Sequence, residues 1–84
     1  MERRTITIEQ AEADNPGVAS VPALARPFGG VHAQWEALKA STRPGDELVA
    51  FESPAASWRA LSGRCGVALV RDGVTVAEVV TTIS

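Results

Sequence analysis

Cys65 and His32 are the first residues in this chain to consider for chemistry, because each is the only residue of its type. An imidazole beside a thiol can activate a cysteine nucleophile, but their separation along the chain does not determine their distance in space. Cys65 stands between Arg64 and Gly66 at the expected start of a strand, where a small thiol packs well. We interpret Cys65 as structural and His32 as a polar residue on a helix surface.

Arginines are the second group of candidates. Arg59, Arg64 and Arg71 could gather where a helix meets a strand, and guanidinium groups there would suit a carboxylate or phosphate ligand. In the alternative, which we favour, they form ordinary surface ion pairs with Glu52, Asp72 or Glu78. We keep Arg59, Arg64 and His32 as candidate ligand-binding residues.

The common catalytic and cofactor motifs do not occur in the sequence. It contains no phosphate-binding glycine loop, no dinucleotide-binding motif, no paired His-Glu zinc motif and no CxxC. One His and one Cys are too few for a structural zinc site without carboxylates, and a single Cys cannot form an internal disulfide. We therefore expect no metal and no cofactor, and we assign no catalytic residue.

Composition and charge narrow the class of protein. The 84 residues fit one domain, 1–84, with 45% hydrophobic and 21% charged residues. The net charge of −2 provides no basic stripe, so neither a nucleic-acid nor a membrane partner is expected. The first residues lack the apolar run of a secretory signal. We predict a soluble, cytoplasmic protein.

The N-terminal third predicts a strand followed by an irregular segment. Alternation over Arg3–Glu9 places Ile6 and Ile8 on one face of a half-buried strand. Residues 18–30 contain two Pro and two Gly, which exclude a long helix. The same segment carries four apolar side chains that we expect to cover one end of the core, the alternative being a binding loop: Val18, Val21, Leu24 and Phe28.

Two short helices and a central strand are predicted next. Trp35 and Leu38 follow Val31 at helical spacing, which indicates a helix over residues 31–41. The apolar run 48–51 indicates a covered strand. Ser53-Pro54 is typical of a helix start, and this helix should reach Leu61, place Trp58 and Leu61 against the core, and end at a left-handed Gly63.

A β-hairpin is predicted at the C-terminus. Asp72-Gly73 separates two β-branched runs and suits a two-residue type I′ turn. Regular pairing from that turn sets Leu69 opposite Val76 on a bulky face that meets the helices. The other face would carry a small apolar patch, which we consider a candidate interaction surface: Ala68, Val70, Ala77 and Val79.

The resulting order, β-α-β-α-β-β, predicts a two-layer α+β domain with a mixed, mostly antiparallel four-stranded sheet. The last strand, residues 74–83, is long and free of Pro, so as an edge strand it could pair with a neighbouring chain.

The C-terminal half also resembles a pattern found in small bacterial proteins of unknown function. The resemblance rests on Pro44-Gly45-Asp46-Glu47-Leu48, Glu52-Ser53-Pro54, Ser57-Trp58, Leu61, Gly63-Arg64 and Ala68-Leu69-Val70-Arg71-Asp72-Gly73. It implies a small free-standing bacterial domain and no activity. We expect a non-enzymatic binding or regulatory domain that associates with itself or with another protein. The alternative is a small-molecule or anion binder, or a minor enzyme, that uses the Arg and His candidates.

Overall fold

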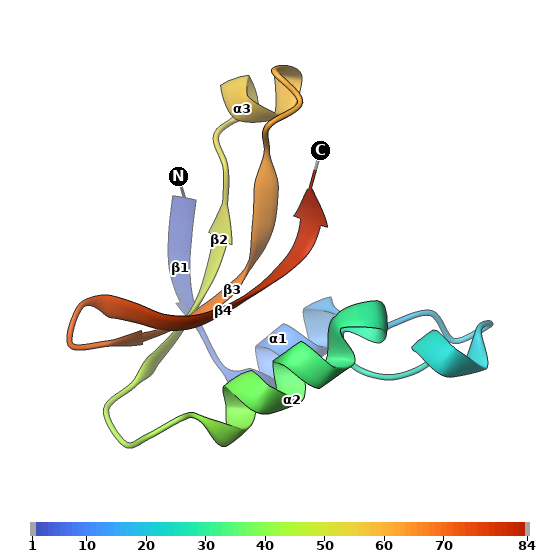
Figure 1. Cartoon of the computed structure of the whole chain (residues 1–84), viewed down its shortest axis with the longest axis horizontal. Coiled ribbons are helices and arrows are strands. Elements are labelled where there is room, and N and C mark those ends of the chain that lie inside the picture. The colour runs from blue at the N-terminus through green and yellow to red at the C-terminus, as the bar shows by residue number, and fades with distance from the viewer. Residues whose placement is uncertain (1, 84) are drawn as a thin grey trace.

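The structure is a computed structural model that describes residues 2–83. Within this range the chain forms one four-stranded sheet, three α-helices and two 3₁₀ turns (Figure 1). The elements are β1 (Glu2–Ile6), α1 (Ile8–Asp14), η1 (Pro22–Leu24), η2 (Gly29–Val31), α2 (His32–Ala40), β2 (Glu47–Glu52), α3 (Ala55–Arg59), β3 (Arg64–Arg71) and β4 (Val74–Ile83). The predicted α+β class and the terminal hairpin are confirmed.

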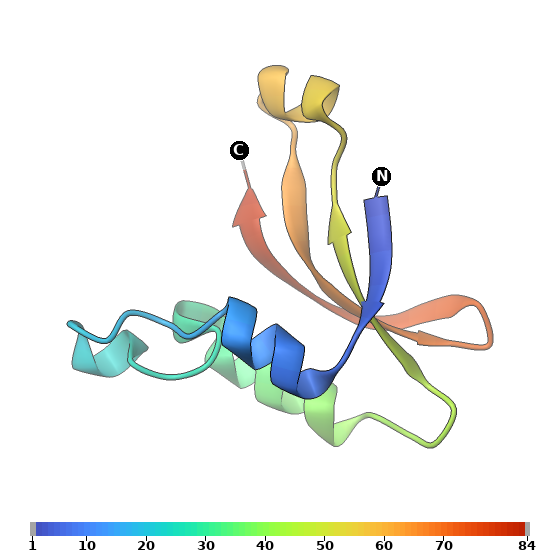
Figure 2. The same cartoon turned by 180° about the vertical axis from the view of Figure 1, so that it is seen from behind.

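The strands lie in the order β1-β2-β3-β4, and every neighbouring pair is antiparallel. The sheet is therefore fully antiparallel rather than mixed as predicted. Helices α1 and α2 lie side by side at one end of the sheet, while the other end extends away from them and carries α3 (Figures 1 and 2). The molecule is a flat L measuring 39 × 36 × 17 Å. Its radius of gyration is 13.2 Å, against about 12 Å for a compact domain of this length.

The strand predicted over Arg3–Glu9 is wrong beyond Ile6, because α1 begins at Ile8. The Thr7 hydroxyl accepts a hydrogen bond of 3.0 Å from the backbone N–H of Gln10, which caps the helix. A Thr followed three residues later by Gln is a capping-box spacing, and this local signal outweighs the short alternation before it.

The terminal hairpin turns at Asp72 and Gly73, both with positive φ (52° and 78°), as a type I′ turn requires. The register predicted beyond the turn is wrong. Leu69 lies opposite Ala77 rather than Val76, and the pairing shifts again between Cys65 and Gly66. Strand β4 has ten residues against eight in β3, and two β-bulges, at Val76 and Thr81, accommodate the difference.

The first bulge determines which side chains of β4 enter the core. Val79 packs with Leu69 beneath the helices and is 1% exposed, whereas Glu78 is exposed. In the unbulged register Glu78 would instead have faced the helices, where a lone carboxylate is costly. The bulge therefore replaces a charged side chain in the core with an apolar one.

The core lies between α1, α2 and the near end of the sheet. Trp35 of α2 is fully buried, and Phe28 stacks on it with ring centroids 4.3 Å apart and an interplanar angle of 19°. Leu48 of β2, together with Leu69 and Val79, completes the strand side of this cluster. Among residues 2–83, no helix is long and apolar enough to cross a membrane.

Only Phe28 of the four apolar residues expected to cover the core does so. Val18 and Val21 are 45% and 41% exposed, and Leu24 is half-buried. Their segment projects beyond the helices, away from the sheet, as both views show (Figures 1 and 2). The apolar residues of this loop therefore contribute more to the surface than to the core.

The helix predicted from Pro54 is shorter than expected, and its last residues differ from prediction. Leu61 does not face the core but is 77% exposed, and it rather than Gly63 takes the left-handed conformation, with φ of 58°. Gly63 lies under the indole ring of Trp58, where a Cβ would overlap the ring. A glycine is needed here for close packing rather than for a turn.

Candidate functional site

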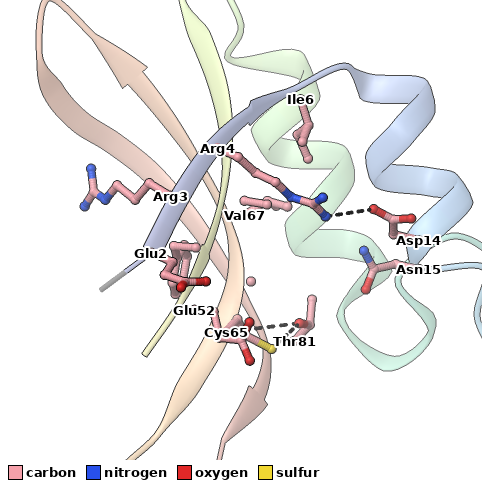
Figure 3. A pocket seen from close by; sticks show the side chains of 13 residues that line it. Glu2, Arg3, Arg4, Ile6, Asp14, Asn15, Glu52, Cys65, Val67 and Thr81 are labelled. Atoms are coloured by element: carbon pink, nitrogen blue, oxygen red, sulfur yellow. Dashed lines mark hydrogen bonds and ion pairs between the residues drawn. The ribbon is translucent and has the colours of Figure 1, made fainter. Parts of the chain in front are cut away.

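A groove of about 660 Å³ crosses the end of the sheet that the helices leave uncovered (Figure 3). Its volume lies in the range of small-molecule sites, about 300–1,000 Å³. Side chains from β1–β4 and from the end of α1 line it. We call it the open groove and define it by Ile6, Ala50, Val67, Cys65 and Thr81 on the sheet and Glu2, Arg4, Asp14 and Glu52 around them.

Strand pairing explains the apolar floor of the open groove. Ala50 lies directly opposite Arg4 on one side and Val67 on the other, and directly paired residues share a face. Val67 is buried, and Ala50 is half-buried. Helix α1 ends at Asp14, so the helical layer stops here and this part of the face has no second layer.

The second bulge of β4 shapes the wall of the open groove. Thr81 is the extra residue, and its hydroxyl donates a hydrogen bond of 3.2 Å to the carbonyl of Cys65. The Cys65 sulfur lies 3.7 Å from the Thr81 hydroxyl and is half-buried. Bulges often re-aim side chains at functional surfaces. The hydrogen-bonding partner of the thiol is thus a hydroxyl, and His32 does not line the groove with it.

Charged groups surround the apolar floor. Arg4 forms an ion pair with Asp14 across the groove at 3.5 Å, and Figure 3 shows Arg3 pointing the other way. Glu2 and Glu52 lie directly opposite each other on β1 and β2. Like charges in this position repel each other. No ion pair joins either glutamate to another residue within 2–83, so the groove has an uncompensated acidic side.

The Arg and His candidates do not form a common site. Arg59 and Arg64 lie at the α3 end of the sheet, whereas His32 begins α2 in the helical layer (Figure 1). Arg64 forms an ion pair with Glu78 at 3.2 Å, one of the pairs anticipated from the sequence. The His32 Nδ1 hydrogen-bonds the carbonyl of Pro27 at 2.8 Å. None of the three candidates lines the open groove.

The four-residue hairpin patch is divided between two faces. Ala68 and Val70 lie on the face away from the helices, in a cluster with Val49, Phe51 and Val80. Ala77 and Val79 belong to the core on the helix side, because the bulge at Val76 turns them over. Strand β4 is an edge strand, as pairing with a neighbour requires, but its two bulges interrupt the row of backbone groups that another strand would use.

Two ion pairs connect neighbouring elements of the fold. The Asp46 carboxylate accepts hydrogen bonds from the Arg71 guanidinium at 2.8 and 2.9 Å, which lower the pKa of Asp46 from 3.8 to about 2. Glu12 of α1 accepts from Lys39 and from the Trp35 indole, each at 2.9 Å, and Lys39 is the larger cause of the lowered Glu12 pKa. The first pair joins the turn before β2 to the hairpin, and the second joins α2 to α1.

The sequence did not single out Glu2, Arg4, Ala50, Val67 or Glu52 as a site. They converge only because β1 pairs with β2, a strand order that alternation alone does not determine.

No group of three or more His, Cys, Asp or Glu side chains between residues 2 and 83 could hold a metal ion. An apolar floor with charged edges is suited to holding an apolar segment of a partner. Comparison of the chain with protein-family models, curated proteins and solved structures finds no match.

Proposed function

We propose that this chain is a non-enzymatic binding domain that acts by associating with protein, either a second copy of itself or another chain. The observation that carries the proposal is the uncovered end of the sheet, where the half-buried apolar residues Ile6 and Ala50 line the open groove beside the end of α1. Exposed apolar surface rimmed by polar residues is typical of protein–protein interaction sites and of ligand-binding grooves.

The shape of the molecule supports this proposal. The described chain exposes 5302 Å², whereas a compact monomer of the same mass exposes about 4,800 Å². Leu61 and Ile83 are 77% and 74% exposed at the same end of the sheet. Extra accessible surface and exposed large apolar side chains favour association with a partner.

Native mass spectrometry of the untagged protein, purified gently from its own host, tests the proposal. A dimer mass or a second polypeptide is the expected result. A monomer with no bound polypeptide across the accessible concentration range contradicts it. A monomer that carries a small-molecule adduct supports the second candidate, a small-ligand site in the same groove, for which the groove's volume is the specific observation.

A further inference from the structure

The loop at the far end of the helical layer combines exposed apolar side chains with one positive charge. Residues 15–25 carry no charge, and Arg26 follows them directly. Val18, Val21 and Arg26 are all exposed. We call residues 18–26 the tip. It offers an apolar surface with one positive charge at its end, and no ion pair joins Arg26 to another residue in 2–83.

The tip is held in one conformation rather than left as a loose loop. The backbone N–H of Val18 donates to the carbonyl of Leu24 at 2.8 Å, and that of Phe28 donates to the carbonyl of Asn15 at 2.8 Å. Gly17 has φ of 82° and is enclosed by the carbonyls of Leu24 and Arg26, so no Cβ fits there. Phe28 also has positive φ, at 66°, and its stacking on Trp35 supports that strained geometry. A surface ordered in advance loses less entropy on binding.

The tip and the open groove are complementary in chemistry. Val18 and Val21 match Ile6 and Ala50, the half-buried apolar residues that line the groove. Arg26 supplies the cation that the opposed Glu2 and Glu52 lack. A charged group of each sign that has no ion pair within its own copy can form one across an interface, which sets register and excludes wrong partners.

The L shape allows each copy to use both surfaces at once. The sheet end and the helical arm are the two arms of the L (Figure 1). The groove runs from Asp14, at the end of α1, along the sheet to Glu52. If a two-fold axis relates two copies so that the tip of one enters the groove of the other, the second tip enters the first groove by the same symmetry. Such an interface is self-complementary and closes at two copies.

We propose that the partner in the open groove is the tip of a second copy of this chain, in a reciprocal two-fold dimer with Arg26 of each copy facing Glu52 of the other. This inference rests on the proposed function and names its partner. It makes Arg26 and Glu52 the residues that determine specificity, with Val18 and Val21 as the apolar anchors.

Charge exchange tests this interface by sedimentation velocity on the full chain. Arg26→Glu alone and Glu52→Arg alone each place like charges at both contacts of a homodimer, so we expect each to weaken dimerisation by about tenfold or more. An equal mixture of the two variants restores opposite charges at both contacts and should form dimers as the wild type does. Arg59→Glu and Glu47→Arg are matched controls at exposed sites outside both surfaces, and they should dimerise normally.

Both variant sites are exposed, and thermal melting checks that each variant is folded; Glu2→Arg replaces Glu52→Arg if that variant does not fold. A wild type that stays monomeric at the highest concentration overturns the inference. So does a dimer that the two variants leave unchanged, or one that the mixture fails to restore. A heterologous polypeptide found by native mass spectrometry would still uphold the proposed function, so the two claims can fail separately.

Discussion

At the end of the sheet that the helices cover, Leu48, Leu69 and Val79 lie beneath Trp35. At the other end Ala50, Cys65 and Thr81 line the open groove. Both ends belong to the same four strands and the same face. They differ because α1 is only seven residues long and stops at Asp14, and because the chain after it turns away into the tip. The domain thus uses its short helical layer to build a core at one end and leaves a binding surface at the other.

The largest expected effect comes from a charge placed at the covered end. Val79→Asp buries an unpaired carboxylate among the core residues, at a cost of about 4 kcal/mol or more. That is comparable with the total stability of roughly 4–13 kcal/mol expected for a domain of this length. We therefore expect the variant to be unfolded, which circular dichroism would detect. Val76→Asp is the matched control, because the bulge leaves Val76 45% exposed. If Val79→Asp were folded and Val76→Asp unfolded, the unbulged register would be the correct one.

Val76 and Val79 also show how much of the fold the sequence predicts. The hairpin, the turn and α2 follow from Asp72-Gly73 and from the spacing of Trp35 and Leu38, which are local signals. The bulges are set by the whole sheet, although Glu78 on an apolar face was a sign that the regular register was wrong. The Thr7–Gln10 capping spacing could likewise have predicted α1. The open groove required the β1–β2 pairing, which is a long-range feature.

A smaller effect is expected at Gly66, which lines the open groove beside the second bulge. A Cβ at this position would overlap the backbone carbonyl of Val79, so Gly66→Ala forces β3 and β4 apart beside the second bulge. Overpacking of this kind costs about 1–3 kcal/mol. Urea denaturation measures the loss. Gly73→Ala tests the separate cost of positive φ, because a Cβ there meets nothing within 4 Å. If Gly66→Ala matches wild-type stability, the close approach of the strands is wrong.

Acid should weaken the ion pair that joins β2 to the hairpin. The pKa of Asp46 falls from 3.8 to about 2 in the folded protein, mainly through its hydrogen bonds with Arg71. A lowered pKa stabilises the fold above pH 4, and this contribution disappears as the pH falls from 4 to 2. Asp46→Asn should therefore be less stable than the wild type at neutral pH and lose less stability over that window. Thermal melts at several pH values measure both, and identical pH profiles would contradict the assignment.

The smallest effect is expected in the open groove itself. Ala50 is half-buried on its floor, so Ala50→Ser adds a hydroxyl that water can reach and should change stability by about 0.5 kcal/mol or less. Chemical denaturation at low protein concentration, where a dimer is dissociated, measures this change in the stability of the monomer. A loss of about 2 kcal/mol would indicate that the groove is closed and dry in solution.

A dilution series followed by ¹H–¹⁵N NMR tests most directly whether the uncovered end of the sheet is the binding surface. The account predicts concentration-dependent shifts at the amides of Ala50 and Val67 in the groove and of Val18 and Val21 in the tip, with Asp72 at the hairpin turn unchanged. Shifts confined to Ala68 and Val70 on the opposite face, or no shifts at any concentration, would contradict it.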